Sequence, residues 1–400
     1  MAIDKSRLQA LTPRLAGAVN NSAANDLDDP TNRQAVVAAA RDILYEATLP
    51  EEQWNEQAAA VGSITATRLF LKWGAFDAIP ATGGITYADL AKTLNADESL
   101  IRRVGGMLVS TRILRQVGDN QLVHTPKSLI QTNSSGYSYL FRMMFDENTF
   151  PFIFMPQYFD KYGLCEPKGE THNPYTFANG QPEKSYWDVM HQDPERMRVF
   201  QQSMRSAEAM MPATGLYDYS WIQGEADKDS DRPLLVDVGG GRGHVVQAIC
   251  EEYTWMPKER CVVQDREDVI KEAQQLDVPE LRGVKLMPHD FNAKQPTKGA
   301  LVYHLRRILH DYGDATCIVI LRHLAEAMAE DSRLLIVDQV VGNPPSQMAA
   351  HFDFVMMTIG GKERTAKDFE RLTKEAGLRI LTVHEKAGAP LAVVECMKVE

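Results

Sequence analysis

The sequence predicts an α/β fold in which a mostly helical first part precedes a doubly wound, mostly parallel sheet. Three observations support this prediction. From residue 234 onward, short apolar runs with strand character alternate with helical segments, which is the rhythm of consecutive βαβ units. The first of these runs leads directly into a glycine-rich turn that opens a helix. The last two runs, 380–385 and 391–398, follow each other without a helix between them, which predicts an antiparallel hairpin at the end of the sheet.

Composition and charge narrow the range of functions. With 400 residues the chain is long enough for two domains, and its 44% hydrophobic and 24% charged residues are ordinary for a globular protein. The formal net charge of −11 repels phosphate backbones and anionic lipids, so we expect neither nucleic acid nor a membrane as a partner. The 5 cysteines are far apart and predict no metal site. No apolar segment has the length of a signal-peptide core or a bilayer span, so we expect a cytoplasmic protein.

Residues 1–135 predict a mostly helical domain. Gly74 ends a helix whose apolar residues recur at helical spacing, and Thr86 and Asp97 each precede a further amphipathic helix as a capping residue. Two short strands around a Gly-Asp-Asn turn, within 113–124, predict a hairpin after the second of these helices. The order helix, helix, hairpin is typical of winged-helix domains. Because the chain is acidic, we favour the formation of a homodimer over DNA binding as the role of this domain.

A segment rich in aromatic residues and methionine, 136–230, precedes the predicted sheet. It shows no period-2 alternation, so we expect helices that are apolar on most sides. Such helices fill a core or form the wall of an apolar pocket, and methionine adapts well to a planar organic ligand. We therefore predict a catalytic domain over 136–400, in which 136–230 is a helical pocket segment and 231–400 is a Rossmann-like core.

The glycine turn after the predicted strand at 234–238 indicates a nucleotide-like ligand. Its glycines let the main chain turn sharply and approach a ligand closely. They stand at 239, 240, 241 and 243, and His244 occupies the position of the third glycine of a dinucleotide-binding motif. This spacing argues against NAD, although an NAD-dependent dehydrogenase stays an alternative.

Two further strand ends carry side chains suited to adenosine. Asp265 ends the next predicted strand, where a carboxylate can accept hydrogen bonds from both ribose hydroxyls. Asp290 and Phe291 follow the strand after that, where an acid can bind the adenine amino group and a ring can pack on the base. The carboxyl ends of parallel strands lie at the edge where such sheets bind ligands. Three markers at this edge predict a site for S-adenosylmethionine.

Three segments together resemble a known enzyme family: the glycine turn at 236–243, the run at 303–312, and Gly-Gly-Lys-Glu-Arg-Thr at 360–365. They are similar to those of class I S-adenosylmethionine-dependent O-methyltransferases of the caffeic acid type, and more closely to fungal relatives that act on secondary metabolites. The resemblance extends from about residue 63 to residue 400. It implies methyl transfer to a hydroxyl, in the first place a phenolic one, of a small aromatic or polyketide-like molecule.

The resemblance also implies roles for single residues. His310 matches the catalytic base, and Asp311 is its acidic neighbour. Asp338 and Glu363 match the two carboxylates that hold the histidine. A histidine with an ordinary pKa near 6.5 is a suitable general base at neutral pH, and such a base contributes on the order of 10²–10⁴-fold to a rate. The residues that match contacts to S-adenosylmethionine are Gly239, Gly240, Gly241, Asp265, Asp290, Phe291 and Arg306.

The acceptor side is less well defined by the resemblance. Met204 and Met356 match methionines that clamp an aromatic acceptor, and His351 and Asp353 are further candidates for the same pocket. Plant members carry an asparagine after the second methionine, whereas this chain reads Met-Thr-Ile at 357–359. The identity of the acceptor therefore does not carry over from the family.

Two further alternatives follow from the sequence. Some fungal proteins that resemble this family bind S-adenosylmethionine but catalyse dehydration or pericyclic ring formation, with the sulfonium charge acting electrostatically. His310, Asp311 and Glu363 favour methyl transfer, whereas Arg306 and Arg307 beside the predicted sulfonium site leave this alternative open. A DNA-binding regulator is the other alternative, and the acidic charge disfavours it.

Overall fold

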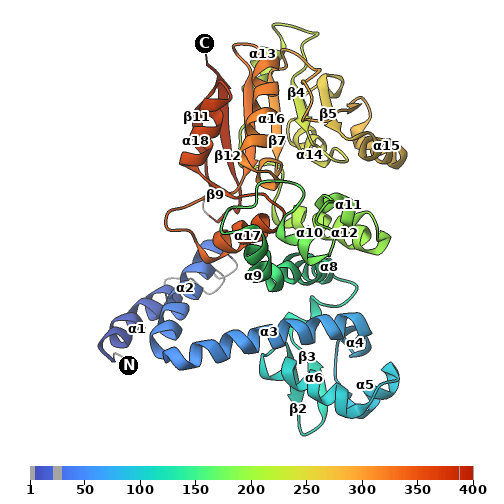
Figure 1. Cartoon of the computed structure of the whole chain (residues 1–400), viewed down its shortest axis with the longest axis vertical. Helices are drawn as coiled ribbons and strands as arrows, with labels where there is room; N and C mark the ends of the chain where they lie inside the picture. Colours follow the sequence, from blue (N-terminus) through green and yellow to red (C-terminus); the bar gives the residue numbers. More distant parts are fainter. Residues whose placement is uncertain (1–4, 21–28, 387, 400) are drawn as a thin grey trace. The chain divides into compact units, whose positions relative to one another are not determined.

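The computed structural model describes residues 5–20, 29–386 and 388–399 (Figure 1). The chain divides into two compact units, Met1–Phe145 and Asp146–Glu400. Each unit has a hydrophobic core of its own. Among the helices of the described residues, none is both long enough and apolar enough to cross a membrane.

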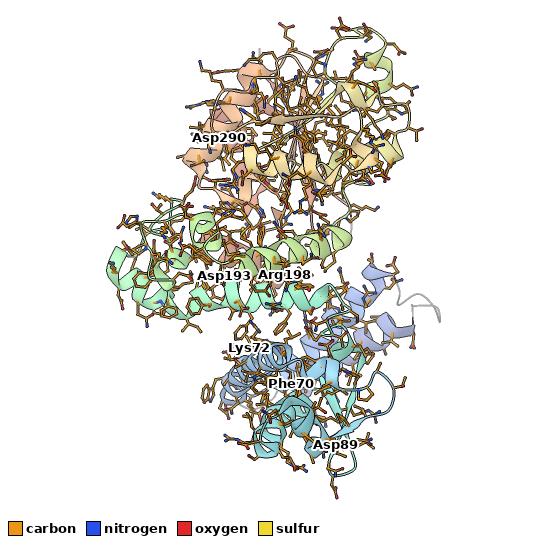
Figure 2. The ribbon with its side chains drawn as sticks, turned by 90° about the vertical axis from the view of Figure 1, so that its right-hand side faces the viewer. Phe70, Lys72, Asp89, Asp193, Arg198 and Asp290 are labelled. Atoms are coloured by element: carbon orange, nitrogen blue, oxygen red, sulfur yellow. The ribbon has the colours of Figure 1, made fainter. Side chains whose placement is uncertain are left out.

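The first unit consists of helices and one small sheet. Strands β1 (Ile85–Thr86), β2 (Leu114–Val117) and β3 (Gln121–His124) form the sheet in the order β1-β3-β2, and both pairings are antiparallel. Phe70, which Figure 2 labels, is fully buried in the core of this unit. The helices are α1 (Lys5–Asn20), α2 (Pro30–Ala47), α3 (Pro50–Trp73), α4 (Ala75–Ala78), α5 (Tyr87–Leu94), α6 (Glu98–Ser110), α7 (Pro126–Leu129) and α8 (Tyr137–Met143).

The helix ends of the first unit follow the residues that the sequence singled out. Gly74 ends α3 with a left-handed φ of 67°. The Thr86 hydroxyl accepts a hydrogen bond of 3.0 Å from the N–H of Asp89 and so caps α5 (Figure 2 labels Asp89). Asp97 precedes α6 but makes no side-chain cap bond. The predicted hairpin is present, whereas β1 has only 2 residues and was too short to show a periodicity. The winged-helix assignment stays a prediction.

The second unit begins with a helical segment, as the absence of alternation predicted. A π-helical turn, η2 (Met144–Thr149), connects α8 to this segment. The Asp193 carboxylate caps α12 by accepting a hydrogen bond of 2.9 Å from the N–H of Glu195, and Figure 2 marks Asp193 and Arg198 at this end of the helix. The helices are α9 (Phe150–Tyr162), α10 (Pro174–Ala178), α11 (Tyr186–Met190), α12 (Pro194–Met210) and α13 (Ile222–Ala226).

A 7-stranded sheet forms the centre of the second unit, in the order β11-β12-β8-β7-β4-β5-β6. The pairings among β4 to β8 are parallel, and β12 runs antiparallel to both β8 and β11. The predicted α/β sheet with a terminal antiparallel hairpin is therefore confirmed. The strands are β4 (Leu235–Val238), β5 (Cys261–Asp265), β6 (Lys285–Pro288), β7 (Val302–Arg306), β8 (Arg333–Asp338), β11 (Leu378–His384) and β12 (Ala392–Lys398).

Helices cover both faces of this sheet. Val236 and Val238 pack in one core cluster with α16 (Asp314–Ala327) and α18 (Ala366–Glu375), whereas Leu235 packs in the other with α13, α14 (His244–Glu252) and α15 (Glu267–Leu276). Figure 1 shows α16 and α18 against the strands of the sheet. Because helices cover both faces of the sheet, side chains on both sides of β4 are buried, and all of them except Asp237 are apolar. The remaining elements are η3 (Lys258–Arg260), η4 (Pro279–Leu281), η5 (Leu309–Asp311), β9 (Val340–Val341), α17 (Gln347–Thr358) and β10 (Arg364–Thr365).

Strand β7 is longer than the apolar run at 300–303, which His304 ends in the sequence. It extends to Arg306, whose main chain is paired with Val337 of β8. His304, which interrupts the apolar run, is only 1% exposed. Its burial is possible because its Nδ1 lies within hydrogen-bond distance, 2.8 Å, of Asp237 Oδ1 on the neighbouring strand. The sequence pattern did not predict the second half of the strand, because a polar residue, His304, stands there and is buried against Asp237. The longer strand places Arg306 at the carboxyl end of the sheet.

Candidate active site

The glycine turn after β4 leaves no room for side chains at two positions. A Cβ atom on Gly239, whose φ is 73°, would lie 2.5 Å from Ile308 Cδ1, and one on Gly240 would overlap the carboxylate of Asp237. Gly241 also has a positive φ, of 58°, but open space around it. The turn therefore needs glycine for its close packing and its backbone shape, and it presents main-chain surface at the edge of the sheet.

Asp265 ties the ends of three strands together. Its Oδ2 accepts a hydrogen bond of 2.8 Å from the N–H of Gly241, and its Oδ1 accepts one of 2.8 Å from Arg266. The N–H of His289, just after β6, donates to the Asp265 carbonyl at 2.8 Å. Burial raises the pKa of Asp265, although the two main-chain donors oppose that shift. The residue predicted to bind ribose thus also orders the glycine turn.

Asp290 and Phe291 lie beside the same turn. Asp290, labelled in Figure 2, is exposed, and its Oδ1 accepts a hydrogen bond of 2.9 Å from the N–H of Asn292. The Phe291 ring is 5.7 Å from the ring of Tyr312, edge to face, and would be 3.7 Å from a Cβ on Gly239. The structure therefore brings together the markers that the sequence placed at successive strand ends.

The edge formed in this way suits an adenosine cofactor with a charged tail. Asp237 Oδ2 is buried and has no hydrogen-bond partner among the described residues, while Asp237 Oδ1 is engaged by His304. A buried carboxylate oxygen without a donor is costly unless a ligand or a proton satisfies it. It lies directly under Gly240, at the turn that has no side chains of its own. The free main-chain surface, the acids at the strand ends and the Phe291 ring together fit S-adenosylmethionine.

His310 lies on the short turn η5, after β7. Its Nδ1 is 2.9 Å from Glu363 Oε1, and its Nε2 is 3.5 Å from Asp311 Oδ1. The side chain is almost completely buried. Because Glu363 accepts from Nδ1, Nε2 is the nitrogen that is left to exchange a proton with a ligand.

Three acids surround His310 and control its charge. Burial by itself lowers the pKa of His310, but the charge of Asp311, the hydrogen bond to Glu363 and the charge of Asp338 together raise it to about 9. Burial raises the pKa of Asp338 to about 7. Neither oxygen of Asp338 has a hydrogen-bond partner in the described part of the chain, and the same holds for Glu363 Oε2. Glu363 thus holds the ring directly, whereas Asp338 acts on it through charge alone.

Arg364 frames the turn that carries His310. It is 1% exposed, and its guanidinium donates to the carbonyl oxygens of Leu309 and Tyr312, both at 2.7 Å. It also forms an ion pair of 2.9 Å with Asp314 at the start of α16. Arg364 is not among the predicted site residues, although it directly follows Glu363 in the sequence. A buried arginine here fixes both ends of η5.

The residues predicted for the acceptor pocket have different surroundings. The sulfur of Met204, on α12, lies 3.9 Å from Nη1 of Arg307. Met356 is partly buried on α17. The His351 ring lies 6.1 Å from the ring of Phe152, edge to face. Asp353 accepts a hydrogen bond of 2.9 Å from the N–H of Glu363, so it positions the acid that holds His310.

The two arginines that end and follow β7 also differ. The Arg306 guanidinium donates to the main-chain carbonyl oxygens of Met211 and Pro212. A contact between Arg306 and the cofactor stays a prediction. Arg307 has a left-handed φ of 53° and points toward Met204. In the part of the chain that is described, no group of three or more His, Cys, Asp or Glu residues is arranged to hold a metal ion.

Comparison with known proteins adds independent information. The family model for the O-methyltransferase domain matches residues 163–379 of this chain. The methyltransferase cfoD of Aspergillus candidus is 38% identical over 401 residues, which cover 98% of this chain and 99% of that protein. OxaC, solved with S-adenosylhomocysteine and oxaline, superposes with a TM-score of 0.86 at 23% identity, over 99% of this chain and 100% of that one. A structure described as a pericyclic reaction enzyme has a TM-score of 0.80 at 20% identity, over 99% and 100% of the two chains. The two solved structures show that the fold is shared.

Proposed function

The chain belongs to the O-methyltransferase family, and we propose that it methylates a hydroxyl group, in the first place a phenolic one, of a small aromatic or polyketide-like metabolite. It is a methyltransferase enzyme, and its cofactor is S-adenosylmethionine. The observation that carries the proposed reaction is the contact of 2.9 Å between His310 and Glu363 on a buried turn at the cofactor edge. A histidine oriented by an acid is the arrangement that a general base requires.

We assign the cofactor to the carboxyl edge of the sheet. Bound there, S-adenosylmethionine supplies an electrophilic methyl group on a positively charged sulfur. The acids and main-chain groups at this edge orient the cofactor, and Phe291 covers its base. The residues that we propose to contact it are Gly239, Gly240, Gly241, Asp265, Asp290, Phe291 and Arg306.

We assign His310 as the base that takes the acceptor's proton at Nε2. Glu363 accepts from Nδ1 and so stabilises the imidazolium that forms. A phenol has an ordinary pKa of about 10, and the pKa of His310 is raised to about 9, so the proton transfer is nearly balanced. Asp338 adds negative charge, and Asp353 holds Glu363 in place. The geometry thus favours removal of a proton in a site that largely excludes water.

We further propose that the acceptor lies against Met204 and Met356, with His351 at the aromatic wall. The contact of 4.8 Å between the rings of Phe152 and Phe354 supports an apolar wall built from α9 and α17. Planar aromatic molecules pack well against such surfaces. The wall explains a preference for flat molecules but does not specify one acceptor.

The first unit is proposed to be a winged-helix module that joins two chains into a homodimer. The order α5, α6 and the β2–β3 hairpin supports this assignment. We propose a cytoplasmic location for the enzyme. Because the net charge is −11, we propose no nucleic-acid or membrane partner.

A second candidate function is a reaction without methyl transfer. The similarity in fold to a pericyclic reaction enzyme supports it. In that case bound S-adenosylmethionine would remain intact while the acceptor rearranges. The base and its oriented acid favour methyl transfer over a pericyclic reaction, because a pericyclic step needs no proton acceptor. A dehydration would use the same base, so it remains the form of this candidate that the experiment must separate from methyl transfer.

One experiment separates the two functions. The purified protein is incubated with S-adenosylmethionine and a panel of phenols and enolic 1,3-dicarbonyl compounds, and S-adenosylhomocysteine is measured by mass spectrometry. We expect S-adenosylhomocysteine to form together with a methylated product. If the protein binds S-adenosylmethionine but forms no S-adenosylhomocysteine with any acceptor, the methyltransferase reaction is refuted and the second candidate gains support.

A further inference from the structure

Arg307 holds an unusual backbone position next to His310. Its φ of 53° lies in the left-handed region, which residues with a Cβ rarely adopt. Its N–H donates to the carbonyl of Val337 at 2.9 Å, so the neighbouring strand holds this conformation. A strained residue that the surrounding fold retains is often part of a functional site. In this conformation the side chain reaches Met204 on α12.

The guanidinium of Arg307 has no acidic partner among the described residues. Its nearest polar contact is the sulfur of Met204 at 3.9 Å, and a thioether is only a weak acceptor. Other partly or fully buried arginines of this unit either donate to main-chain carbonyl oxygens, as Arg260 and Arg306 do, or are paired with acids. Arg196 contacts Glu147 at 2.5 Å, and Arg364 contacts Asp314 at 2.9 Å. Arg307 is therefore an exception that the fold alone does not explain.

The charges around Arg307 leave it available for a ligand. Arg307 acts on Asp311 through its charge. Burial raises the pKa of Asp311, and the positive charge of Arg307 opposes that shift. Asp311 Oδ1 also lies 3.5 Å from His310 Nε2, so the charge of Asp311 acts on the base as well, although Asp311 forms no ion pair with Arg307. Arg306, the adjacent cation, uses its donors on the carbonyls of Met211 and Pro212. Of these two neighbouring cations, Arg307 is thus the one whose guanidinium is not engaged by an oxygen acceptor of the described residues.

Tyr186, on α11, is a partly buried phenol of the same unit, and its ring packs against Tyr175. Burial is the main cause that raises the pKa of its phenol, and the charges of Glu147 and Asp311 add to it. The hydroxyl of Tyr186 therefore stays protonated and can donate a hydrogen bond. A neutral donor in this unit and a guanidinium without an acidic hydrogen-bond partner suit a ligand that carries negative charge on oxygen.

We propose that Arg307 binds the acceptor as an oxyanion, so that the enzyme selects small planar molecules with an acidic hydroxyl, such as phenols and enols, or with an ionised acid group at that position. This inference rests on the proposed function. The acceptor's proton goes to His310 Nε2, and the negative charge left on oxygen lies against the Arg307 guanidinium. Hydrogen bonds between ions are roughly twice as strong as those between neutral groups, so a charged acceptor gains most from Arg307.

The test compares two ligands of the same shape. The protein is saturated with S-adenosylhomocysteine, and the binding of 2-naphthoate and 2-naphthamide is measured by calorimetry. We expect the wild type to bind the carboxylate at least about tenfold more tightly than the amide. Arg307→Gln should reduce this preference to less than about threefold, whereas Arg307→Lys should retain most of it. Equal affinities in the wild type, or a preference that survives in Arg307→Gln, would overturn the proposal.

Matched variants separate the role of Arg307 from the roles of its neighbours. Arg205→Gln removes an exposed charge next to Met204 on α12 and should leave the preference intact. Arg307→Asn tolerates the left-handed backbone, so it replaces Arg307→Gln if that variant does not fold. A preference that is lost in His310→Gln but kept in both Arg307 variants would assign the effect to His310 and overturn the proposal. Failure of the proposed function appears separately, as the absence of S-adenosylhomocysteine while the naphthoate preference persists.

Discussion

Asp265 reaches the N–H of Gly241 across 24 positions of one βαβ unit, whereas His310 is held by Glu363 from 53 positions further along the chain. On the cofactor side, the site is formed mainly by main-chain groups and short loops at adjacent strand ends. On the acceptor side, side chains from the turn after β7, from β10 and from α12 meet over long separations. The first arrangement follows from the topology of a parallel sheet. The second arrangement depends on tertiary packing between distant segments, which the sequence of any one segment does not reveal.

The largest expected effect lies on the acceptor side. His310→Ala should lower the methylation rate by about 10²–10⁴-fold, because the acceptor's proton then has no base. Binding of S-adenosylhomocysteine, measured by calorimetry, should stay within about twofold of the wild type, since His310 is not among the proposed cofactor contacts. An equal loss of rate and of cofactor affinity would mean that His310 is a structural residue and that the two sides are not separable.

The difference between the two sides also explains how far the sequence was informative. The glycine turn, Asp265 and Asp290 were recognisable because each directly follows an apolar strand run, which is a local pattern. The antiparallel hairpin β11–β12 was predictable for the same reason. The domain boundaries and the roles of the site residues stay predictions.

The acceptor side gave weaker local signals. Helix α17 was not predicted as an element, because it is apolar on several faces and shows little periodicity. Arg307 and Arg364 belong to runs of charged residues that resemble an exposed loop, yet Arg364 is buried and Arg307 is strained. Their roles depend on carbonyl oxygens and sulfur atoms of other segments, and no single-sequence pattern encodes those contacts.

Arg364 offers the next test on the acceptor side. Arg364→Lys keeps the positive charge but loses the planar fork that reaches Leu309 and Tyr312 together. We expect kcat to fall by about ten- to a hundredfold while the KM for S-adenosylmethionine changes by less than about twofold, because a base misplaced by even 1 Å slows transfer strongly. Arg371→Gln is the control, since Arg371 contacts the same Asp314 from the protein surface. Equal losses in both variants would make the ion pair with Asp314, and not the framing of η5, the cause.

On the cofactor side, Asp265→Ala should reverse this pattern. The variant loses an acceptor for the ribose hydroxyls and also the bond that orders Gly241, so the affinity for S-adenosylmethionine should fall by about tenfold or more. At saturating cofactor, kcat should change by less than about threefold. Asp290→Ala is the matched variant and should cost less, because Asp290 is exposed and already engaged by Asn292. A fall in kcat at saturation would show that the cofactor side also controls the reaction step.

The smallest expected effect concerns pH and tests the acids around the base. His310 must be neutral to accept a proton, and its pKa is raised to about 9, so kcat/KM should rise with pH up to that value. Glu363→Gln removes a negative charge and the charged hydrogen-bond acceptor of Nδ1, so the pKa of His310 should fall and the rise should move toward neutral pH by about one unit or more. The pH profile of kcat/KM measures the shift directly.

Asp338→Asn provides the control for that profile, because Asp338 acts on His310 through charge without a hydrogen bond. Its shift should have the same sign and be smaller. As the pH rises, stability should fall while activity increases. A histidine whose pKa is raised in the folded state stabilises the fold fully below about pH 6.5, and it loses that contribution as the pH rises through about 9. The free energy of unfolding of the wild type should therefore decline over this interval, whereas His310→Gln should decline less. A profile that Glu363→Gln leaves unshifted would mean that another group limits kcat/KM, and the acids would then serve the fold and not the base.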